Sequence, residues 1–356
     1  MGEDIQLMKG NEAIAEAAIR FGVDAYFGYP ITPQSEIIEY LAYEDPYNKR
    51  TGMVVIQAES EIAAINMVYG AAACGKKAMT SSSSPGISLK QEAISYMVGA
   101  ELPGLIVNVV RGGPGLGTIQ PSQADYFQSV KGGGHGDYNM IVLAPSTVQE
   151  QYDHVGLGFE LAFKYRNPVM ILSDGAIGQM MEKVTLTPQL PRENKILDWA
   201  TTGKTPDRER NYITSLYLDP EVQENHNIKL QAKFQRMKDT EVRYEEIMTD
   251  DAEYIIVAYG ISARISQTVI TMARKNGIKL GLLRPITLFP FPTKRLFELS
   301  DSLKGILCVE MSAGQMIEDV ELAVRCKIPV YHYGRMGGGV TSSTEVYEKF
   351  VSLFLK

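Results

Sequence analysis

The segment Gln57-Ala58-Glu59-Ser60-Glu61-Ile62-Ala63-Ala64 joins an apolar run at residues 53–56 to an alanine-rich run at residues 62–75. The first run has the composition of an apolar strand and the second that of a helix. A carboxylate at the start of a helix is stabilised by the helix dipole and by unpaired backbone N–H groups. Taken alone, the segment is typical of an ordinary acidic helix start, so its meaning depends on the turns around it.

Three more turns follow apolar strands in the same way. They are Tyr-Pro-Ile-Thr-Pro (29–33), Ser-Ser-Ser-Ser-Pro-Gly (81–86) and Arg-Gly-Gly-Pro-Gly-Leu-Gly (111–117). The carboxyl ends of parallel strands meet at one edge of a sheet, and open α/β sheets bind their ligands at that edge. The four turns together therefore predict a binding site.

Helical and strand patterns alternate along the first half of the chain. Continuous apolar runs such as residues 105–110 suit strands of a parallel sheet that is buried on both faces. The alternation predicts an α/β fold, with a doubly wound parallel sheet in a first domain over residues 1–185. Its strands are expected at residues 25–27, 53–56, 78–80, 105–110, 140–143 and 168–172.

The pattern changes after residue 185. Residues 186–250 are rich in charge, proline and asparagine, and we expect a linker that contains one long polar helix over residues 222–248. A second α/β domain is expected over residues 251–356, with strands at 254–257, 280–283 and 306–309.

Composition excludes several classes of protein. The 356 residues are 45% hydrophobic and 22% charged, which is typical of a globular protein. A net charge of −7 without a Lys/Arg cluster argues against a nucleic-acid partner. No apolar run is long enough to span a membrane, and no signal peptide is evident. The three cysteines form no CxxC pair, so we expect no iron–sulfur cluster or other metal in this chain and a cytoplasmic location.

Two side chains in the turns have two interpretations each. The hydroxyl of Thr32 is either presented to a ligand or caps a helix whose first residue is Pro33. Arg111 leaves an apolar strand into a glycine-rich loop, where its planar fork suits a carboxylate or phosphate. The alternative for Arg111 is an ion pair with Glu59 or Glu101.

Other patterns carry less weight. The loop after Arg111 reads GxGxG rather than GxGxxG and follows the fourth strand, so a dinucleotide site is not expected. His135 lies in a flexible glycine-rich turn and is a candidate ligand contact, although a single histidine is more often structural. Glu59 and Glu61 are two residues apart and cannot share a helix face, so they are not an acid/base pair.

At these motifs the chain resembles the alpha subunits of the 2-oxoacid:ferredoxin oxidoreductases, and within that family the branched-chain (2-ketoisovalerate) members most. The resemblance covers essentially the whole chain. It rests on the four turns above, extended to Gln-Ala-Glu-Ser-Glu-Ile-Ala-Ala-Ile-Asn (57–66), and on Gly-Gly-Gly-His-Gly-Asp (132–137), Leu-Arg-Pro-Ile-Thr-Leu-Phe-Pro-Phe-Pro (283–292), Val-Glu-Met-Ser-Ala-Gly-Gln-Met (309–316) and Gly-Arg-Met-Gly-Gly (334–338).

The resemblance implies a thiamine-diphosphate enzyme with a pyrimidine-binding first domain and a second domain like the transketolase C-terminal domain. Glu61 matches the glutamate that hydrogen-bonds the ring nitrogen N1′, and Glu59 is the second choice. Thr32 and Arg111 match contacts to the substrate carboxylate. Gln120 stands where many relatives have a threonine, and it is the expected replacement. The remaining expected contacts are Pro30, Ser83 and Ser84 with the cofactor and His135 with the substrate.

The resemblance also implies missing parts. The diphosphate and Mg²⁺ site of such enzymes needs Gly-Asp-Gly followed by Asn, but here Gly136-Asp137 is followed by Tyr138. We therefore expect a beta subunit to hold the diphosphate and Mg²⁺, and ferredoxin-like and gamma subunits to complete a complex with iron–sulfur clusters. The expected reaction is the oxidative decarboxylation of a branched-chain 2-oxoacid to an acyl-coenzyme A, with reduction of ferredoxin. A homodimer of two alpha chains is a further option.

Three alternatives stay open at this point. The same reaction could act on 2-oxoglutarate or pyruvate, because one or two methylenes are weakly discriminated by an apolar pocket. A non-catalytic nucleotide-binding subunit would not need Glu61, Thr32 and Arg111. A transketolase-like aldehyde transferase would not need Arg111.

Overall fold

The computed structural model describes residues 4–192 and 195–355. Its largest sheet has seven strands in the order β12-β6-β7-β5-β4-β2-β3, and every pair is parallel except β12 with β6. The predicted doubly wound α/β fold is confirmed. The strands are β2 (Ala25–Gly28), β3 (Val54–Gln57), β4 (Ala78–Ser82), β5 (Gly104–Val110), β6 (Ile141–Leu143), β7 (Pro168–Asp174) and β12 (Thr287–Phe289).

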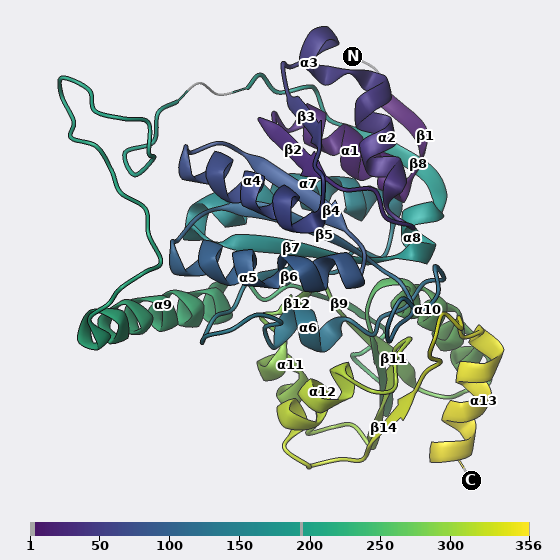
Figure 1. The fold of residues 1–356 in the computed structure, drawn as a ribbon. Helices are drawn as coiled ribbons and strands as arrows, with labels where there is room; N and C mark the ends of the chain where they lie inside the picture. Colours follow the sequence, from purple (N-terminus) through teal and green to yellow (C-terminus); the bar gives the residue numbers. More distant parts are fainter. Residues whose placement is uncertain (1–3, 193–194, 356) are drawn as a thin grey trace.

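Helices cover both faces of this sheet (Figure 1). On one face α4 packs against α5, and on the other α1 packs against α7. Strand β5 is buried along its whole length, as expected for a central strand between two helical layers. The helices are α1 (Gly10–Arg20), α2 (Ser35–Glu44), α3 (Pro46–Lys49), α4 (Glu61–Ala73), α5 (Pro85–Gly99), α6 (Tyr126–Val130), α7 (Val148–Tyr165) and α8 (Gly175–Gln179).

A two-stranded antiparallel ribbon was not expected. Strand β1 (Asp4–Lys9) pairs with β8 (Met181–Leu186), which brings the two ends of the first α/β unit together. Within residues 4–192 and 195–355, no helix combines the length and the apolar character that crossing a membrane requires.

The second sheet has five strands in the order β14-β13-β10-β11-β9, with only β9 antiparallel to its neighbour. Its strands are β9 (Tyr244–Ile247), β10 (Tyr254–Ala258), β11 (Leu280–Pro285), β13 (Gly305–Val309) and β14 (Val330–Tyr333). Its helices are α10 (Gly260–Lys275), α11 (Thr293–Leu299), α12 (Met316–Val324) and α13 (Ser343–Phe354). The expected strands at residues 254–257, 280–283 and 306–309 are all present.

The long polar helix is shorter than predicted. Helix α9 spans Pro220–Thr240, so the prediction that it continues to residue 248 was wrong. Residues 244–247 form β9 instead, because Arg284 binds Glu245 at 2.7 Å and Arg295 binds Glu246 at 2.6 Å from the neighbouring elements. These tertiary ion pairs outweigh a local charge pattern that favours a helix. The division of the chain at residues 185 and 251 stays a prediction.

A strand pairing and a buried arginine connect the two sheets. Strand β12 follows β11 in the chain but pairs with β6 of the first sheet. The buried guanidinium of Arg284, on β11, donates to Glu150 of α7 at 2.6 and 2.8 Å and to Ser146 at 2.9 Å. These contacts hold the second domain in a fixed position beside the first.

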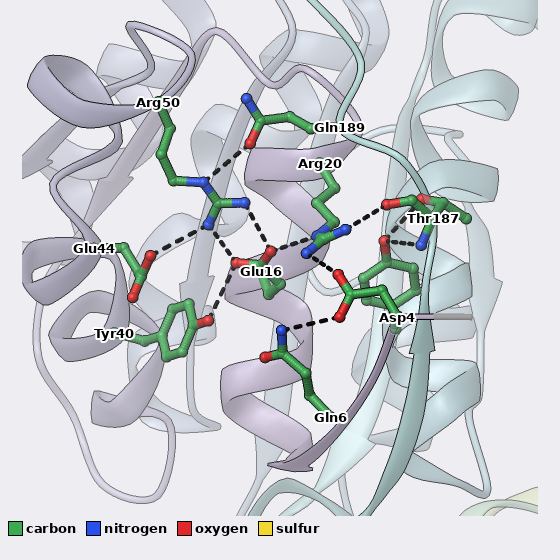
Figure 2. Close-up of polar contacts among 10 residues, drawn as sticks. Asp4, Gln6, Glu16, Arg20, Tyr40, Glu44, Arg50, Thr187 and Gln189 are labelled. Carbon is green, nitrogen blue, oxygen red and sulfur yellow. Dashed lines mark hydrogen bonds and ion pairs between the residues drawn. The ribbon is translucent and has the colours of Figure 1, made fainter. Parts of the chain in front are cut away.

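A buried carboxylate on α1 lies at the centre of a cluster of polar contacts in the first domain (Figure 2). Glu16 of α1 is only 2% exposed and accepts hydrogen bonds from Arg20, Arg50 and Tyr40, at 2.5 to 3.1 Å. The Arg20 guanidinium also donates a hydrogen bond to the carboxylate of Asp4 on β1. Burial raises the pKa of Glu16, but the hydrogen bonds from Arg50 and Arg20 outweigh burial, and its pKa lies below the usual 4.5.

Glu16→Gln is expected to destabilise the chain by about 3 kcal/mol at pH 7, because it leaves two partly buried guanidinium groups, on Arg20 and Arg50, without the buried anion that they share. Since the pKa of Glu16 is lowered in the folded state, its contribution is complete above about pH 4.5 and is lost as the pH falls through the folded pKa. Urea unfolding of wild type and variant at pH 7 and in the acid range measures both effects, and the difference between them should shrink in acid.

Glu44→Gln provides the matched control, because Glu44 touches the same Arg50 at 3.3 Å but its side chain is 29% exposed. It should cost less than about 1 kcal/mol. Equal losses for the two variants, or a loss at Glu16 that does not change with pH, would contradict this assignment.

Candidate cofactor and substrate site

The four turns singled out in the sequence lie at one edge of the first sheet. Strands β3, β2, β4 and β5 are consecutive neighbours and all parallel, so their carboxyl ends point the same way. The turns at residues 29–33, 58–60, 83–84 and 111–117 follow those ends directly. The prediction of a shared edge is confirmed, and the side chains in these turns can now be placed.

Glu61 is the first residue of α4 and is buried, with 7% of its surface exposed. Ser60 caps the helix, because its hydroxyl accepts from the Ala63 N–H at 3.2 Å. No hydrogen bond between the described residues reaches the Glu61 carboxylate. The carboxylate lies against the start of α5, where a Cβ on Gly86 would come within 2.8 Å of Glu61 Oε1. A buried carboxylate without donors is suited to accept a hydrogen bond from a ligand.

Lys90 is a functional candidate that sequence reasoning missed. Its ammonium group is fully buried and donates to the backbone oxygen of Glu61 at 3.2 Å and to Thr80 Oγ1 at 3.1 Å. Burial lowers the pKa of Lys90 to about 8, against the opposing effect of the Glu61 charge. A lysine between Ile87 and Ile94, at helical spacing on the buried face of α5, is the signal that could have revealed it.

The serine-rich turn after β4 joins two strand ends. Ser84 has φ of 27°, an unusual value for a residue with a side chain, and its N–H donates to the Asn108 side chain at 3.1 Å. The Ser84 hydroxyl also exchanges hydrogen bonds with the backbone of Arg111 at 3.0 and 3.2 Å. The neighbouring hydroxyls of Ser82 and Ser83 are buried and have no partner among the described residues. They leave two donors for a ligand at this edge.

Arg111 is buried and bound to backbone oxygens. Its guanidinium donates to the Thr32 carbonyl at 3.0 Å and to the Leu116 carbonyl at 3.1 Å, while its buried Nε has no partner among the described residues. The alternative of an ion pair with Glu59 or Glu101 is wrong, since Glu101 pairs with Lys229 and Lys233 and no such contact joins Arg111 to Glu59. The cation of Arg111 is therefore not neutralised by a carboxylate of the described residues.

The remaining residues of the turns are more exposed. Pro30, Thr32, Glu59 and Gln120 all have exposed side chains. Thr32 does not cap a helix, because α2 begins at Ser35 with Gln34 in the capping position. The capping interpretation of Thr32 was therefore wrong. The Gln34 side chain donates to the Tyr29 carbonyl at 3.1 Å, and the turn continues for two residues beyond Thr32 before the helix begins. The exposed hydroxyl of Thr32 stays available to a ligand.

His135 lies apart from the other candidates. Its ring packs edge-on against Tyr96, at 5.7 Å between centroids, and its carbonyl accepts from Ser95. Both partners lie near the carboxyl end of α5, whereas the serine turn precedes the amino end. About ten residues of helix, or roughly 15 Å, separate the two ends. Within this chain, the structure does not bring His135 to Arg111 or Glu61.

The second domain contributes to the wall of the site. The glycine-rich loop 334–339 packs so closely on the arginine loop that a Cβ on Gly112 would lie 2.8 Å from the backbone of Gly337. A Cβ on Gly338 would lie 2.4 Å from the Cβ of Gln120. Glycine is required where two backbones approach this closely. The motif at residues 334–338 thus supports the loop that carries Arg111. Within the described residues, no group of three or more His, Cys, Asp or Glu side chains is placed to hold a metal ion.

Comparison with known proteins identifies the relatives of this arrangement. Residues 16–257 match the family model described as pyruvate flavodoxin/ferredoxin oxidoreductase, thiamine-diphosphate-binding, and residues 252–346 match the pyruvate:ferredoxin oxidoreductase core domain II. The chain is 51% identical over 344 residues to the ketoisovalerate oxidoreductase subunit VorB of Methanothermobacter thermautotrophicus, covering 97% of this chain and 96% of that protein. The 2-oxoglutarate synthase subunit KorA of the same organism is 35% identical, with coverage of 97% and 98%.

Solved structures agree with these matches. The chain superposes on the 2-oxoglutarate:ferredoxin oxidoreductase of Magnetococcus marinus, determined with 2-oxoglutarate, coenzyme A and succinyl-CoA bound, with a TM-score of 0.88 and 26% identity. The match covers 98% of this chain and 65% of that one. A split-gene transketolase, at 14% identity and a TM-score of 0.61, shares the fold alone. The two family models and the extent of the sequence identity show that the chain belongs to the 2-oxoacid:ferredoxin oxidoreductase family.

Proposed function

We propose that this chain is the pyrimidine-binding alpha subunit of a thiamine-diphosphate-dependent 2-oxoacid:ferredoxin oxidoreductase whose substrate is a branched-chain 2-oxoacid such as 2-ketoisovalerate. The relatives at 50% and 51% identity are both ketoisovalerate oxidoreductase subunits, which favours that substrate over 2-oxoglutarate. The product is the branched acyl-coenzyme A, and the electrons pass to ferredoxin. The three free cysteines suit a reducing compartment such as the cytoplasm.

The buried, unpartnered carboxylate of Glu61 is the observation that carries this proposal. The chemistry of its surroundings fits the aminopyrimidine of thiamine diphosphate, because the hydroxyls of Ser82 and Ser83 and the Nε of Arg111 are also buried without partners. Together they offer one acceptor and several donors at a single edge of the sheet, as a polar heterocycle requires. When bound, thiamine diphosphate supplies the electron sink for decarboxylation.

Each residue has a distinct role in this proposal. Glu61 holds a proton at the pyrimidine nitrogen N1′, and Lys90 orients the first turn of α4 through the Glu61 backbone oxygen. Arg111 and Thr32 hold the substrate carboxylate, so that the keto carbon faces the reactive end of the cofactor. Pro30, Ser83 and Ser84 line the cofactor side of the site. Glu59 is the second candidate, after Glu61, for the carboxylate that hydrogen-bonds N1′. Gln120, next to Gly338, takes the place of the family threonine.

The proposed assembly is a complex of several different subunits. This chain lacks the Gly-Asp-Gly…Asn pattern for a diphosphate and Mg²⁺ and lacks paired cysteines for iron–sulfur clusters. A beta subunit carries the first, and ferredoxin-like and gamma subunits complete the complex. His135 lies too far from Arg111 to contact the same carboxylate within one chain, so its role as a substrate contact depends on how the partners fold over α5.

Glu61→Gln in the reconstituted complex should slow exchange of the thiazolium C2 proton by about 100-fold or more, because an amide cannot hold the proton at N1′ as a carboxylate does. The exchange rate is followed by proton NMR in deuterated buffer, and oxidative decarboxylation should fall in parallel. The fold should be unaffected.

Glu59→Gln is the matched control, two residues away and exposed. It should exchange the C2 proton at the wild-type rate. If Glu59→Gln is slow and Glu61→Gln is normal, the two roles are exchanged. If both variants are normal, the assignment of Glu61 is refuted.

Arg111→Lys should lower kcat/KM by about 10-fold or more for every 2-oxoacid, because lysine keeps the charge but loses the two-pronged geometry. The order of preference among 2-ketoisovalerate, 2-ketoisocaproate, pyruvate and 2-oxoglutarate should not change, with the branched acids first. Steady-state kinetics with the four substrates measure both expectations.

Arg236→Lys, at an exposed position of α9 away from this edge, is the control and should behave as wild type. Unaltered kinetics in Arg111→Lys would leave Arg111 with only its backbone contacts to Thr32 and Leu116. A changed order of preference would show that Arg111 contacts the acyl tail.

A further inference from the structure

An arm of this chain exposes apolar side chains at its periphery. The arm, residues 202–219, contains no helix and connects the first domain to α9 beyond the ends of α4 and α5 (Figure 1). Tyr212, Leu216 and Leu218 are 80%, 70% and 89% exposed. Single exposed apolar residues are normal, but three within seven residues of one arm expose apolar area whose burial by another molecule would be favourable.

The arm has a defined shape. The Arg208 guanidinium donates to the backbone oxygens of Leu197 and Asp198, both at 3.2 Å, and to the Thr202 hydroxyl at 2.7 Å. Asn211 donates to the Ala200 carbonyl at 3.1 Å. These side-chain contacts hold the base of the arm, so presenting its apolar residues to a partner costs less conformational entropy than ordering a free loop.

Both ends of the arm are fixed near the carboxyl ends of α4 and α5. Thr201, just before the arm, donates to the Ala73 carbonyl at 2.9 Å. Beyond its other end, His226 of α9 bonds the Gly99 carbonyl at 2.7 Å. Near its end, Ser215 packs so closely on Gly99 that a Cβ there would lie 3.1 Å from the Cβ of Ser215. The arm therefore continues the surface that α4 and α5 form.

The outer faces of α4 and α5 also expose apolar side chains, next to the polar Asn66, Ser88 and Glu92. Ile62 and Met67 lie on α4 and are 52% and 38% exposed, and Leu89 and Tyr96 lie on α5 at 50% and 38%. A helix with apolar residues on nearly all sides, as α4 has, is typical of one that protein covers all round. The face begins at Glu61 and the serine turn and reaches the arm about 20 Å away, the length of α5.

We propose that the arm is a clasp for the subunit that carries the diphosphate half of the cofactor site. This inference rests on the proposed function. A subunit that completes the site approaches Glu61, the first residue of α4, where the face of α4 and α5 begins, and we place that subunit over this face. That position leaves the face closed to a second copy of this chain. The same subunit then reaches the arm at the far end of the two helices, where Tyr212, Leu216 and Leu218 bind its apolar surface.

The triple variant Tyr212→Ser, Leu216→Ser, Leu218→Ser tests the clasp in the full chain. The variant is mixed with the separately purified beta subunit, and the dissociation constant is measured by analytical ultracentrifugation. We expect a rise of about 100-fold or more, the scale of losing a cluster of apolar anchors. The thermal unfolding midpoint should match wild type. In the presence of the remaining subunits, activity should return when the beta subunit is saturating, because the cofactor site is untouched.

The matched control replaces equally exposed side chains elsewhere, in Tyr43→Ser, Tyr47→Ser, Leu322→Ser, at 81%, 63% and 70% exposure. It should bind the beta subunit as wild type does. A second measurement, independent of any variant, is amide hydrogen exchange of wild-type residues 202–219, which should slow when the beta subunit is added.

Two results would overturn the clasp. One is an unchanged dissociation constant with unprotected arm amides. The other is loss of self-association of this chain in the triple variant with normal binding of the beta subunit, which would make a second copy the occupant. Failure of the proposed function has a different signature, because it appears as a wild-type complex that assembles normally and does not decarboxylate 2-oxoacids.

Discussion

The parallel pairing of β3, β2, β4 and β5 is the constraint on which the rest of this molecule depends. Because these four strands run in one direction, turns that are far apart in the sequence open at one edge. The hydrogen bonds of Ser84 with the backbone of Arg111, and of Arg111 with the Thr32 carbonyl, then lock three of the four turns into one surface. The proposed site is therefore a consequence of strand direction, and its residues need not be neighbours in the chain.

Several buried polar groups at this edge have no hydrogen-bond partner among the described residues. Burial of Glu61, Ser82, Ser83 and the Arg111 Nε without partners costs free energy, and a protein accepts that cost where a ligand supplies the missing hydrogen bonds. The ammonium group of Lys90 is also buried beneath the first turn of α4, but it has partners there in the Glu61 backbone oxygen and Thr80 Oγ1. The exposed apolar side chains of α4 and α5 are a second unsatisfied feature, because no protein surface among the described residues covers them. The two deficits adjoin at Glu61, the first residue of α4, so the proposed partner subunit would meet both.

The sequence could predict the alternation of strands and helices, because apolar runs and their spacing record local burial. It could also place Glu61 at a helix start, since the capping pattern of Ser60 is local. What it could not predict depends on distant contacts. Strand β9 forms because Arg284 and Arg295 hold its glutamates, β12 crosses to the first sheet, and His135 is drawn to Tyr96. In each case the deciding partner is remote in the chain, so no window of sequence contains it.

The central claim is that this chain holds only half of a thiamine-diphosphate site. Calorimetric titration of thiamine diphosphate and Mg²⁺ into the purified chain, and then into the chain with its beta subunit, tests it most directly, with turnover of 2-ketoisovalerate measured on both samples. The account predicts weak binding by the chain alone and tight binding by the chain with its beta subunit, with no turnover by the chain alone and turnover by a third sample that contains every subunit of the complex. Tight binding and oxidative decarboxylation by the single purified chain would contradict it.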